Sequence, residues 1–345
     1  MNQSSVRSDT YPFVSIIMPV RNEEKYIERS LVAVLEQDYP SDRMEIVITD
    51  GMSTDSTREI INRLIQGREN ILVIDNPNKI VAPGLNLGIK ITKGEIIIRV
   101  DGHCVIASDY VRKCVKYLLS EPIVGVGGPL ETIGETQTAE TIALAMSTPF
   151  GVGGSAFRTV KDRSMYVETI PFPAYWREDV NEAGPFDEKL VRNQDDEYNF
   201  RLRSRGGKLL LAPDLKSKYY SRSSVKSVWR QYYQYGFYKV RVMQKHFQQM
   251  RFRQFIPAMF IGGIVGTVLL SLIWKPGWIF FAGLLCSYIV LNLFYSISTA
   301  AKTNWRHLFL LPLIFSVLHV SYGLGFWIGL IKFSINWRQF NRMSN

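Results

Sequence analysis

The stretch Glu95–Ile106, EIIIRVDGHCVI, decides the fold of the first part of the chain. Three isoleucines and a valine carry the chain to Asp101, and such an apolar run is typical of a strand covered on both faces. Gly102 and His103 follow, so an acid and an imidazole come directly after a buried strand. Residues i and i+2 of an extended segment point to the same side. Asp101 and His103 can therefore face one ligand, although a lone histidine can also simply bond to nearby backbone.

The segments before this stretch alternate between strand and helix patterns. Short apolar runs predict strands, and between them apolar residues recur at helical spacing after Ser and Asp capping candidates. The predicted strands cover 14–19, 45–50, 71–75 and 95–101. Continuous apolar strands that alternate with helices predict an α/β fold with a mostly parallel sheet and helices on both faces.

Polar residues gather where three of these strands end. In open parallel sheets, ligands bind beyond the carboxyl ends of the strands. The residues in question are Arg21, Asn22 and Glu23, then Asp50, Gly51 and Ser53, then Asp101 and His103. This pattern predicts a binding site, although Asp50 before a glycine is also a common turn former or helix cap.

The composition divides the 345-residue chain into two parts. Residues 1–253 are mixed and charged, whereas 255–333 are mostly apolar. The net charge of +10 favours an anionic partner. Acid clusters at the strand ends and the lack of a nucleic-acid-binding motif argue that this partner is not nucleic acid. The three cysteines form neither a disulfide framework nor a CxxC metal clip.

Three apolar segments, at 255–274, 277–295 and 308–330, approach or exceed the roughly 20 residues that cross a bilayer. Residues 239–254 are basic and interleaved with Phe and Met, which predicts a helix lying on an anionic leaflet; an ordinary linker helix is the alternative. We expect three spans. An odd number places the basic C-terminus outside, against the positive-inside tendency, so the third segment, with its glycines and His319, is the best candidate for an interfacial or re-entrant helix.

Four motifs in order resemble family-2 glycosyltransferases of the GT-A fold. They are VSIIMPVRNEEKYIERSLVAVLEQDYP, EIVITDGMSTDST, RVDGH and FDEKLVRNQDDEYNFRLRSRGGKL. The resemblance extends over about Val14 to Gly236 and is strongest to the membrane-anchored ExoA-type enzymes of bacterial exopolysaccharide assembly. It implies a cytosolic, Rossmann-like GT-A domain at 1–238, an interfacial helix at 239–254, a transmembrane region at 255–333 and a polar tail at 334–345.

The resemblance also implies an activity. We expect an inverting enzyme that moves a hexose from a nucleotide sugar, UDP-glucose being the expected donor, to a polyprenyl-diphosphate-linked sugar. It would work at the bacterial inner membrane with its catalytic domain in the cytoplasm. A processive polysaccharide synthase and a non-catalytic nucleotide-binding membrane protein remain as alternatives.

The donor site follows from the matched motifs. In the family an acid at Asp50 lies against the uracil ring; for Asn86, a turn or capping role remains open. The residues that the resemblance assigns to nucleotide binding are Pro19, Val20, Arg21, Glu23, Asp50, Gly51, Ser53, Asn86 and Asp101.

A divalent cation, Mn²⁺ or Mg²⁺, usually neutralises the diphosphate leaving group of such enzymes. The family's usual ligand motif is Asp-x-Asp, whereas this chain has Asp101 and His103, as the ExoA-type branch does. Imidazole shifts the preference toward Mn²⁺.

A second acid cluster, QDDEYNFRL, corresponds to the family's Glu-Asp pair, whose aspartate is the catalytic base. Aligned by its Arg-Leu end, Gln194 replaces the glutamate and Asp195 is the base that takes a proton from the acceptor. A slip of one residue makes Asp196 the base instead. Acids also stabilise helix N-termini without any catalytic role.

The segment 221–236 lies where processive relatives carry Gln-x-x-Arg-Trp. Here the order is Trp229-Arg230-Gln231, so that motif is absent as written. Arg222 and Arg230 are candidates for diphosphate contact, and Trp229 for stacking on an acceptor sugar, with Gln231 beside them. A membrane-facing amphipathic helix explains the aromatic residues equally well.

Overall fold

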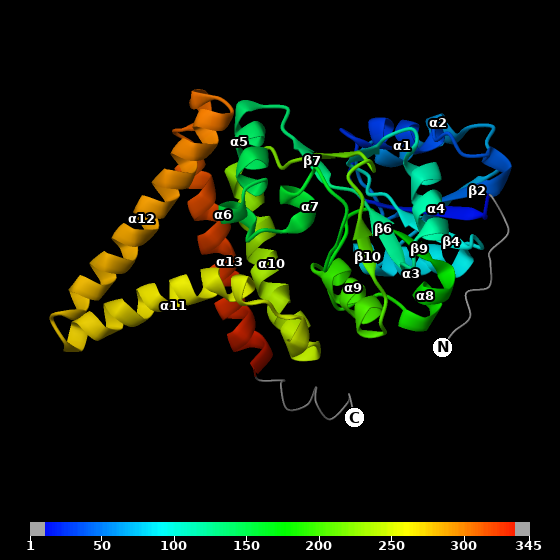
Figure 1. The fold of residues 1–345 in the computed structure, drawn as a ribbon. Coiled ribbons are helices and arrows are strands. Elements are labelled where there is room, and N and C mark those ends of the chain that lie inside the picture. The colour runs from blue at the N-terminus through cyan, green and yellow to red at the C-terminus, as the bar shows by residue number, and fades with distance from the viewer. Residues whose placement is uncertain (1–10, 335–345) are drawn as a thin grey trace. The chain divides into compact units, whose positions relative to one another are not determined.

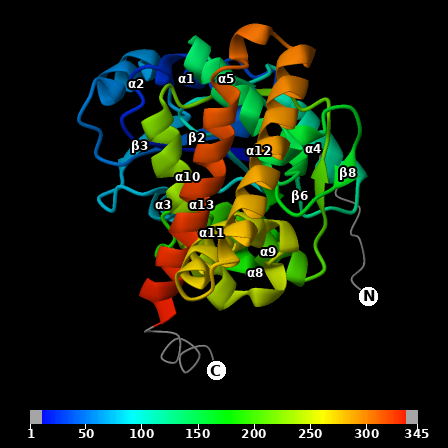
Figure 2. The same cartoon turned by 90° about the vertical axis from the view of Figure 1, so that its left-hand side faces the viewer.

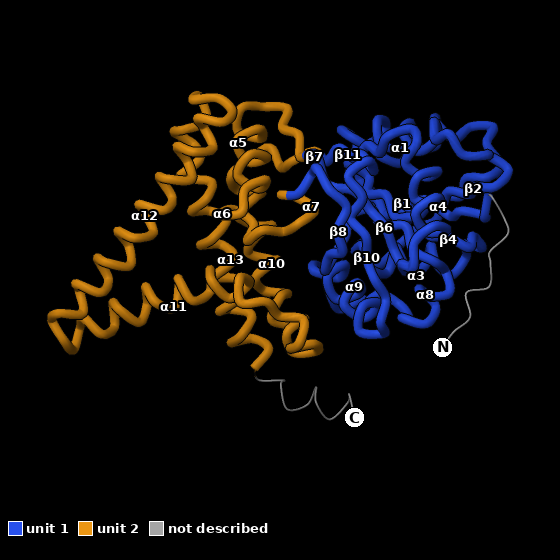
Figure 3. Tube along the Cα trace, in the orientation of Figure 1, with its two compact units in different colours: residues 1–131, 160–219 blue, residues 132–159, 220–345 orange. Residues whose placement is uncertain are grey.

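The computed structural model describes residues 11–334, so the predicted tail, apart from Ser334, lies outside the described residues. The described chain forms two compact units (Figure 3). The first contains the residues up to 131 and those from 160 to 219. The second contains 132–159 and the residues from 220 onward.

The first unit is built on an eight-stranded sheet with the strand order β3-β2-β1-β4-β9-β6-β10-β8 (Figure 1). The strands β3, β2, β1 and β4 run parallel; β9 is antiparallel to both β4 and β6, and β8 to β10. The predicted mostly parallel α/β sheet is confirmed. The strand bounds are β1 (Val14–Val20), β2 (Met44–Asp50), β3 (Ile71–Asp75), β4 (Ile96–Arg99), β6 (Gly125–Gly127), β8 (Met165–Tyr166), β9 (Ala174–Trp176) and β10 (Leu209–Leu211).

A small second sheet has the order β5-β11-β7, formed by β5 (Cys104–Ile106), β11 (Ser217–Tyr220) and β7 (Leu130–Ile133). The helices of the first unit are α1 (Ile27–Leu35), α2 (Thr57–Ile65), α3 (Val81–Ile91), α4 (Tyr110–Ser120), α8 (Arg177–Ala183) and α9 (Gln194–Ser204).

The central position of β1 explains its composition. All seven of its residues are buried, because β2 and β4 flank it and helices cover the sheet. Helix α3 packs directly on β1 and β2. A Cβ added at Gly88 of α3 would lie only 2.6 Å from Cγ2 of Ile17, so the helix backbone needs a glycine to approach this closely.

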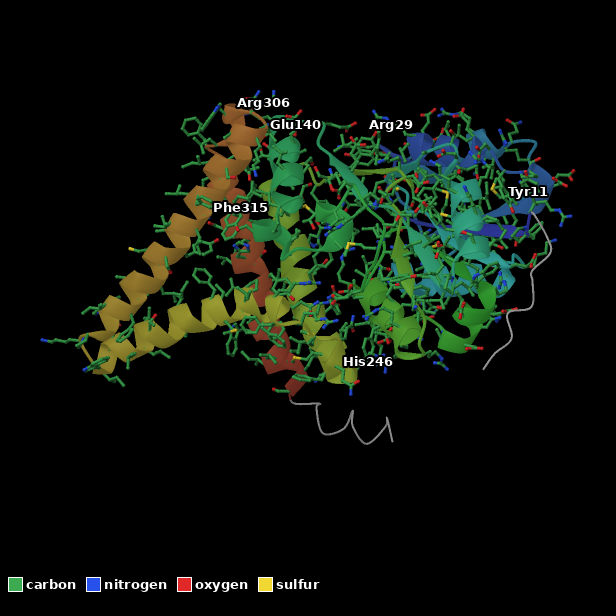
Figure 4. The ribbon with its side chains drawn as sticks, viewed as in Figure 1. Tyr11, Arg29, Glu140, His246, Arg306 and Phe315 are labelled. Carbon is green, nitrogen blue, oxygen red and sulfur yellow. The ribbon has the colours of Figure 1, made fainter. Side chains whose placement is uncertain are left out.

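The second unit is helical. Three of its helices, α11, α12 and α13, are long and apolar enough to cross a membrane, as the sequence predicted. The unit consists of α5 (Gln137–Met146), α6 (Pro149–Val152), α7 (Ala156–Thr159), α10 (Val225–Lys245), η2 (Phe247–Gln249), α11 (Phe252–Ile273), α12 (Gly277–Lys302), η3 (Trp305–His307) and α13 (Leu311–Ser334). Its largest core gathers residues of α5, α10 and α13 around Phe315 (Figure 4).

The Gly-rich residues 147–158 contain the short helices α6 and α7; Gly151 is buried, and a Cβ there would lie 2.1 Å from the Ala145 carbonyl. One segment differs from the sequence interpretation. Residues 239–254 do not form one helix. They comprise the end of α10, η2 and the start of α11, because the backbone leaves the helical conformation at His246 and is extended at Arg251.

The contact between α3 and β1 gives a first prediction. Replacing Gly88 by valine should lower the free energy of unfolding by about 1–3 kcal/mol, because the new side chain overpacks a buried strand. Lys90→Val, at an exposed position of the same helix, is the matched control for the helix propensity of valine. Unfolding followed by tryptophan fluorescence measures both. Equal unfolding midpoints for the two variants would contradict the close packing.

Candidate active site

The loops that follow β1 and β2 are tied together at the carboxyl ends of the strands. The Ser53 hydroxyl accepts from the Asn22 N–H at 3.0 Å, and the Asn22 side chain accepts from the Thr54 N–H at 2.9 Å. The Glu23 N–H donates to the Thr57 hydroxyl at 2.7 Å. Asn22 has a φ of 53°, a left-handed conformation that asparagine tolerates better than most residues. The predicted residues of these two strand ends therefore do come together.

Asp50 ends β2 and is 3% exposed. Its carboxylate accepts from the Ser53 hydroxyl at 2.6 Å and from Arg58 Nη1 at 3.1 Å, and the same Nη1 donates to Asp75 at 2.8 Å. Arg58 thus neutralises two acids at neighbouring strand ends. Asp50 is held in one orientation, which suits both a ligand contact and a turn-forming role.

Arg99, the last residue of β4, joins the two acidic motifs. Its Nε and Nη2 form a fork on both oxygens of Asp101, at 2.7 and 3.0 Å. Its Nη1 donates to Oδ1 of Asp195, in the first turn of α9. The arginine side chain is only 10% exposed. One buried guanidinium is therefore hydrogen-bonded to both the candidate metal ligand, Asp101, and the candidate base, Asp195.

This arrangement controls the charges of all three groups. Burial alone would raise the pKa of Asp101, but the charge of Arg99 and its hydrogen bonds outweigh burial and lower it. Burial raises the pKa of Asp195 above the ordinary value, and Arg99 opposes that rise. Since 45% of the Asp195 side chain is still exposed, we expect its rise to be modest. The two acids raise the pKa of Arg99 despite its burial, so it remains a cation.

His103 is oriented by Glu23. Its Nδ1 lies 2.8 Å from Oε1 of Glu23, and its ring packs edge-on against Tyr219. A Cβ at Gly102 would come within 3.0 Å of the Glu23 side chain, so glycine allows this close approach. With Nδ1 engaged, Nε2 has no hydrogen-bond partner among residues 11–334. A histidine whose other nitrogen faces a carboxylate is the usual arrangement of a metal ligand.

The donor set fits a cation only in part. No three His, Cys, Asp or Glu side chains converge on a metal position within the described chain. Asp101 and His103 are two suitable ligands, each with its own orienting partner, Arg99 and Glu23. They fit a divalent cation whose remaining ligands come from a bound diphosphate and water.

The other predicted donor-site residues have structural partners. Pro19 and Val20 are buried at the end of β1, and the Cβ of Arg21 lies beside Gly51. The Asn86 side chain accepts from the Phe186 N–H at 2.8 Å and donates to the Phe186 carbonyl at 3.0 Å, so it anchors the segment that leads to α9.

The four candidate acceptor residues all belong to the second unit. Arg222 precedes α10, and Trp229, Arg230 and Gln231 lie on that helix. Gln231 is buried and donates to the Tyr235 hydroxyl at 3.0 Å, whereas Trp229 and Arg230 are exposed. Their acceptor role remains a prediction.

Sequence reasoning missed Arg99 and Arg58. A signal for Arg99 was present, since it lies two residues before Asp101 in an extended segment and so points to the same side. No local pattern identifies Arg58, because its partner Asp75 lies on the next strand.

Comparison with known proteins places this geometry in context. The family model of glycosyl transferase family 2 matches residues 15–182. The dolichyl N-acetyl-alpha-D-glucosaminyl phosphate 3-beta-D-2,3-diacetamido-2,3-dideoxy-beta-D-glucuronosyltransferase of Methanococcus voltae is 31% identical over 328 residues, which cover 93% of this chain and 98% of that protein. The succinoglycan biosynthesis protein ExoA of Rhizobium meliloti (strain 1021) is 27% identical over 323 residues, or 92% and 95% of the two chains.

A solved structure shares the fold. The mannosyltransferase PcManGT from Pyrobaculum calidifontis, in complex with GDP-Man and Mn²⁺, matches with a TM-score of 0.56 at 18% identity, covering 93% of this chain and 90% of that one. The protein is thus a glycosyltransferase whose sheet has the GT-A fold. It belongs to glycosyl transferase family 2, and the predicted resemblance is confirmed.

The bridging arginine gives a second prediction. Arg99→Met leaves two carboxylates without their shared counter-ion and should lower the free energy of unfolding by about 3–5 kcal/mol. Arg99→Lys keeps the charge but loses the fork, so its loss should be smaller. Arg112→Met, which removes an exposed arginine paired with the exposed Asp38, should leave stability nearly unchanged. If Arg99→Met unfolds like Arg112→Met, Arg99 is not the shared counter-ion.

Proposed function

We propose that this enzyme transfers a hexose, with inversion, from a nucleotide sugar to a sugar carried on a polyprenyl-diphosphate lipid. We expect UDP-glucose to be the donor. The reaction would belong to exopolysaccharide assembly and would occur at the cytoplasmic side of a bacterial inner membrane. The observation that carries the proposal is that one guanidinium, that of Arg99, donates hydrogen bonds to both Asp101, the candidate metal ligand, and Asp195, the candidate base.

The donor would bind beyond the carboxyl ends of β1, β2 and β4. Asp50, which Arg58 and Ser53 hold in one orientation, would accept hydrogen bonds from the nucleotide base. The backbone of Gly51 and the end of β1 would contact the base and ribose. Asp101 and His103 would hold a divalent cation, Mn²⁺ or Mg²⁺, which neutralises charge on the departing diphosphate.

The transfer needs one base. Asp195 would accept the proton of the acceptor hydroxyl as its oxygen forms a bond to the anomeric carbon. The bond between that carbon and the diphosphate oxygen breaks on the opposite face, so the configuration inverts. Arg99 orients Asp195 through its hydrogen bond, which favours Asp195 over Asp196 as the base.

A lipid-linked acceptor is supported by two observations. The Methanococcus voltae relative, matched over 98% of its length, is named for a dolichyl-phosphate-linked sugar. Three helices of this chain are also apolar enough to enter a membrane. A processive synthase is the second candidate, and product length separates the two: a single added sugar supports the proposal, whereas long chains contradict it.

The assignment of the base is tested by two neighbouring substitutions. Asp195→Asn should lower turnover by about 10²–10⁴-fold, the usual contribution of a general base, whereas Asp196→Asn should keep most of the activity. Transfer from UDP-glucose, GDP- and dTDP-hexoses to polyprenyl-diphosphate-linked sugars, read by mass spectrometry, measures both.

The same assay should show a pH dependence. Because burial raises the pKa of Asp195, the ionised base is lost as the pH falls through a value above the ordinary 3.8 of aspartate. Activity should therefore fall on the acid side of the profile, and Asp196→Asn should leave that limb in place. A larger loss with Asp196→Asn than with Asp195→Asn would reverse the assignment.

The role of Glu23 is tested without turnover. Glu23→Gln should weaken Mn²⁺ binding in the presence of UDP by about 10–100-fold, the usual cost of losing a partner that orients a ligand. Free Mn²⁺ counted by electron paramagnetic resonance gives the affinity. The matched control is Glu24→Gln, whose carboxylate accepts instead from the Ser56 N–H. Unchanged Mn²⁺ affinity in Glu23→Gln would remove His103 from the proposed ligands.

A further inference from the structure

We infer that the chain crosses the membrane twice, through α11 and α12, and that α13 lies along the leaflet surface on top of α10. The end of α13 is then on the same side of the membrane as α10. The inference rests on the packing and the charges of the second unit and does not depend on the proposed reaction.

Helix α13 is unlike the other two apolar helices in its burial. Half of its most apolar stretch is buried inside the protein, compared with 17% in α11 and 11% in α12. The hydropathy of α13 and α12 is similar, at 1.7 and 1.9. Composition therefore makes all three helices equivalent, whereas packing separates α13 from the pair.

The partner of α13 is α10, and the two helices lie side by side in both views (Figures 1 and 2). They run parallel, since the middle of one contacts the middle of the other and Gln244 near the end of α10 donates to the Phe333 carbonyl at 2.9 Å. Glycines allow the two backbones to meet. A Cβ added at Gly236 would lie 2.0 Å from the Tyr322 carbonyl oxygen, and one added at Gly325 would lie 2.1 Å from the Tyr233 carbonyl oxygen.

Helix α10 cannot accompany α13 across a bilayer. A lysine or arginine costs about 2.5–3.5 kcal/mol at the centre of a membrane-spanning helix. Five such residues occur within the 21 residues of α10, and that helix is not among those apolar enough to span. They are Lys226, Arg230, Lys239, Arg241 and Lys245. Because α13 is packed along α10, α13 remains outside the bilayer core as well.

The start of α13 is held on the α10 side. Arg306, just before α13, pairs with Glu140 of α5 (Figure 4), and His307 Nδ1 lies 2.8 Å from the Thr141 hydroxyl. Helix α5 is in turn tied to the segment that enters α10, since the Ser221 hydroxyl donates to the Ala139 carbonyl at 2.9 Å. The end of α12 and the start of α13 thus share a side with α10.

The end of α13 is held on that side too. Phe333, near the end of α13, accepts a hydrogen bond from Gln244, near the end of α10. From there the chain continues through η2 into α11. A helix with both ends fixed on one side of a membrane cannot cross it. Among the connections that the structure describes in the second unit, only residues 274–276, between α11 and α12, are left to reach the opposite side.

The distribution of positive charge agrees with this topology. The α10 side carries Arg251, Arg253, Lys302 and Arg306 close to the ends of the two spans, whereas the α11–α12 connection contains Lys275 alone. A two-span hairpin therefore satisfies the positive-inside tendency, which a three-span chain does not. The exposed residues of α13, including Leu313, Ile328 and Ile331, would face the lipid tails of an anionic leaflet.

Single cysteines in the full chain test the topology. Cys286, the exposed native cysteine, is replaced by serine, while Cys104 and Cys114 are buried. Cysteines are then placed singly at three exposed positions: Ser223 before α10, Lys275 in the α11–α12 connection, and Ser334 at the end of α13. A membrane-impermeant maleimide is applied to intact spheroplasts and to inverted membrane vesicles.

We expect Ser223→Cys and Ser334→Cys to react from the same side and Lys275→Cys to react only from the other. Detergent-solubilised protein, in which all three should react, confirms that each thiol is competent. Labelling of Ser334→Cys together with Lys275→Cys would establish three spans and overturn the inference. Labelling of Ser334→Cys from neither side, or from both, would also overturn it, because the end of α13 would not have one fixed surface position.

Discussion

The guanidinium of Arg99 is the interaction on which the site depends. It is buried between two carboxylates that come from segments 94 residues apart in the chain, Asp101 and Asp195. Desolvating three charged groups is costly, and the cost is offset only if the geometry is good and every group remains paired. The strand β4 must therefore end where it does, because a shift of one residue would turn Arg99 to the other face of the sheet.

The sheet around Arg99 explains how that geometry is kept. The strand β4 lies between β1, which is entirely buried, and β9, which runs antiparallel to it. The neighbours on both sides fix the register of β4, and α3 is locked on β1 through Gly88. The same rigidity reaches the loops, because hydrogen bonds join the segment after β1 to the segment after β2. Asp50, Asp101 and His103 therefore lie on a preorganised edge of the sheet.

Much of this could be predicted from the sequence, and the limits have physical causes. The strands β1 to β4 are apolar runs with helical segments between them, and that pattern specifies a parallel sheet. The strands β6, β8, β9 and β10 have two or three residues each, too few to show a period, so only tertiary pairing defines them. The polar residues at the strand ends were found because parallel connectivity brings those ends together. Their charge partners were not found. Arg58 pairs with Asp75 of another strand, which leaves no local pattern. Arg99 has a local signal toward Asp101, but its bond to Asp195, 96 residues further along the chain, leaves none.

The second unit shows a different limit of sequence reasoning. A high hydropathy means that a helix favours removal of its side chains from water, but it does not say whether lipid or protein covers them. In α13, apolar residues and glycines are covered by α10 and α5, whereas most of the surface of α11 and α12 is not covered by protein. The basic residues of α10 then decide where α13 lies, because two helices packed along their length must either both enter the membrane or both remain outside it. An apolar helix bound along its length to a charged amphipathic partner belongs at the surface, where the first can face lipid tails and the second the head groups.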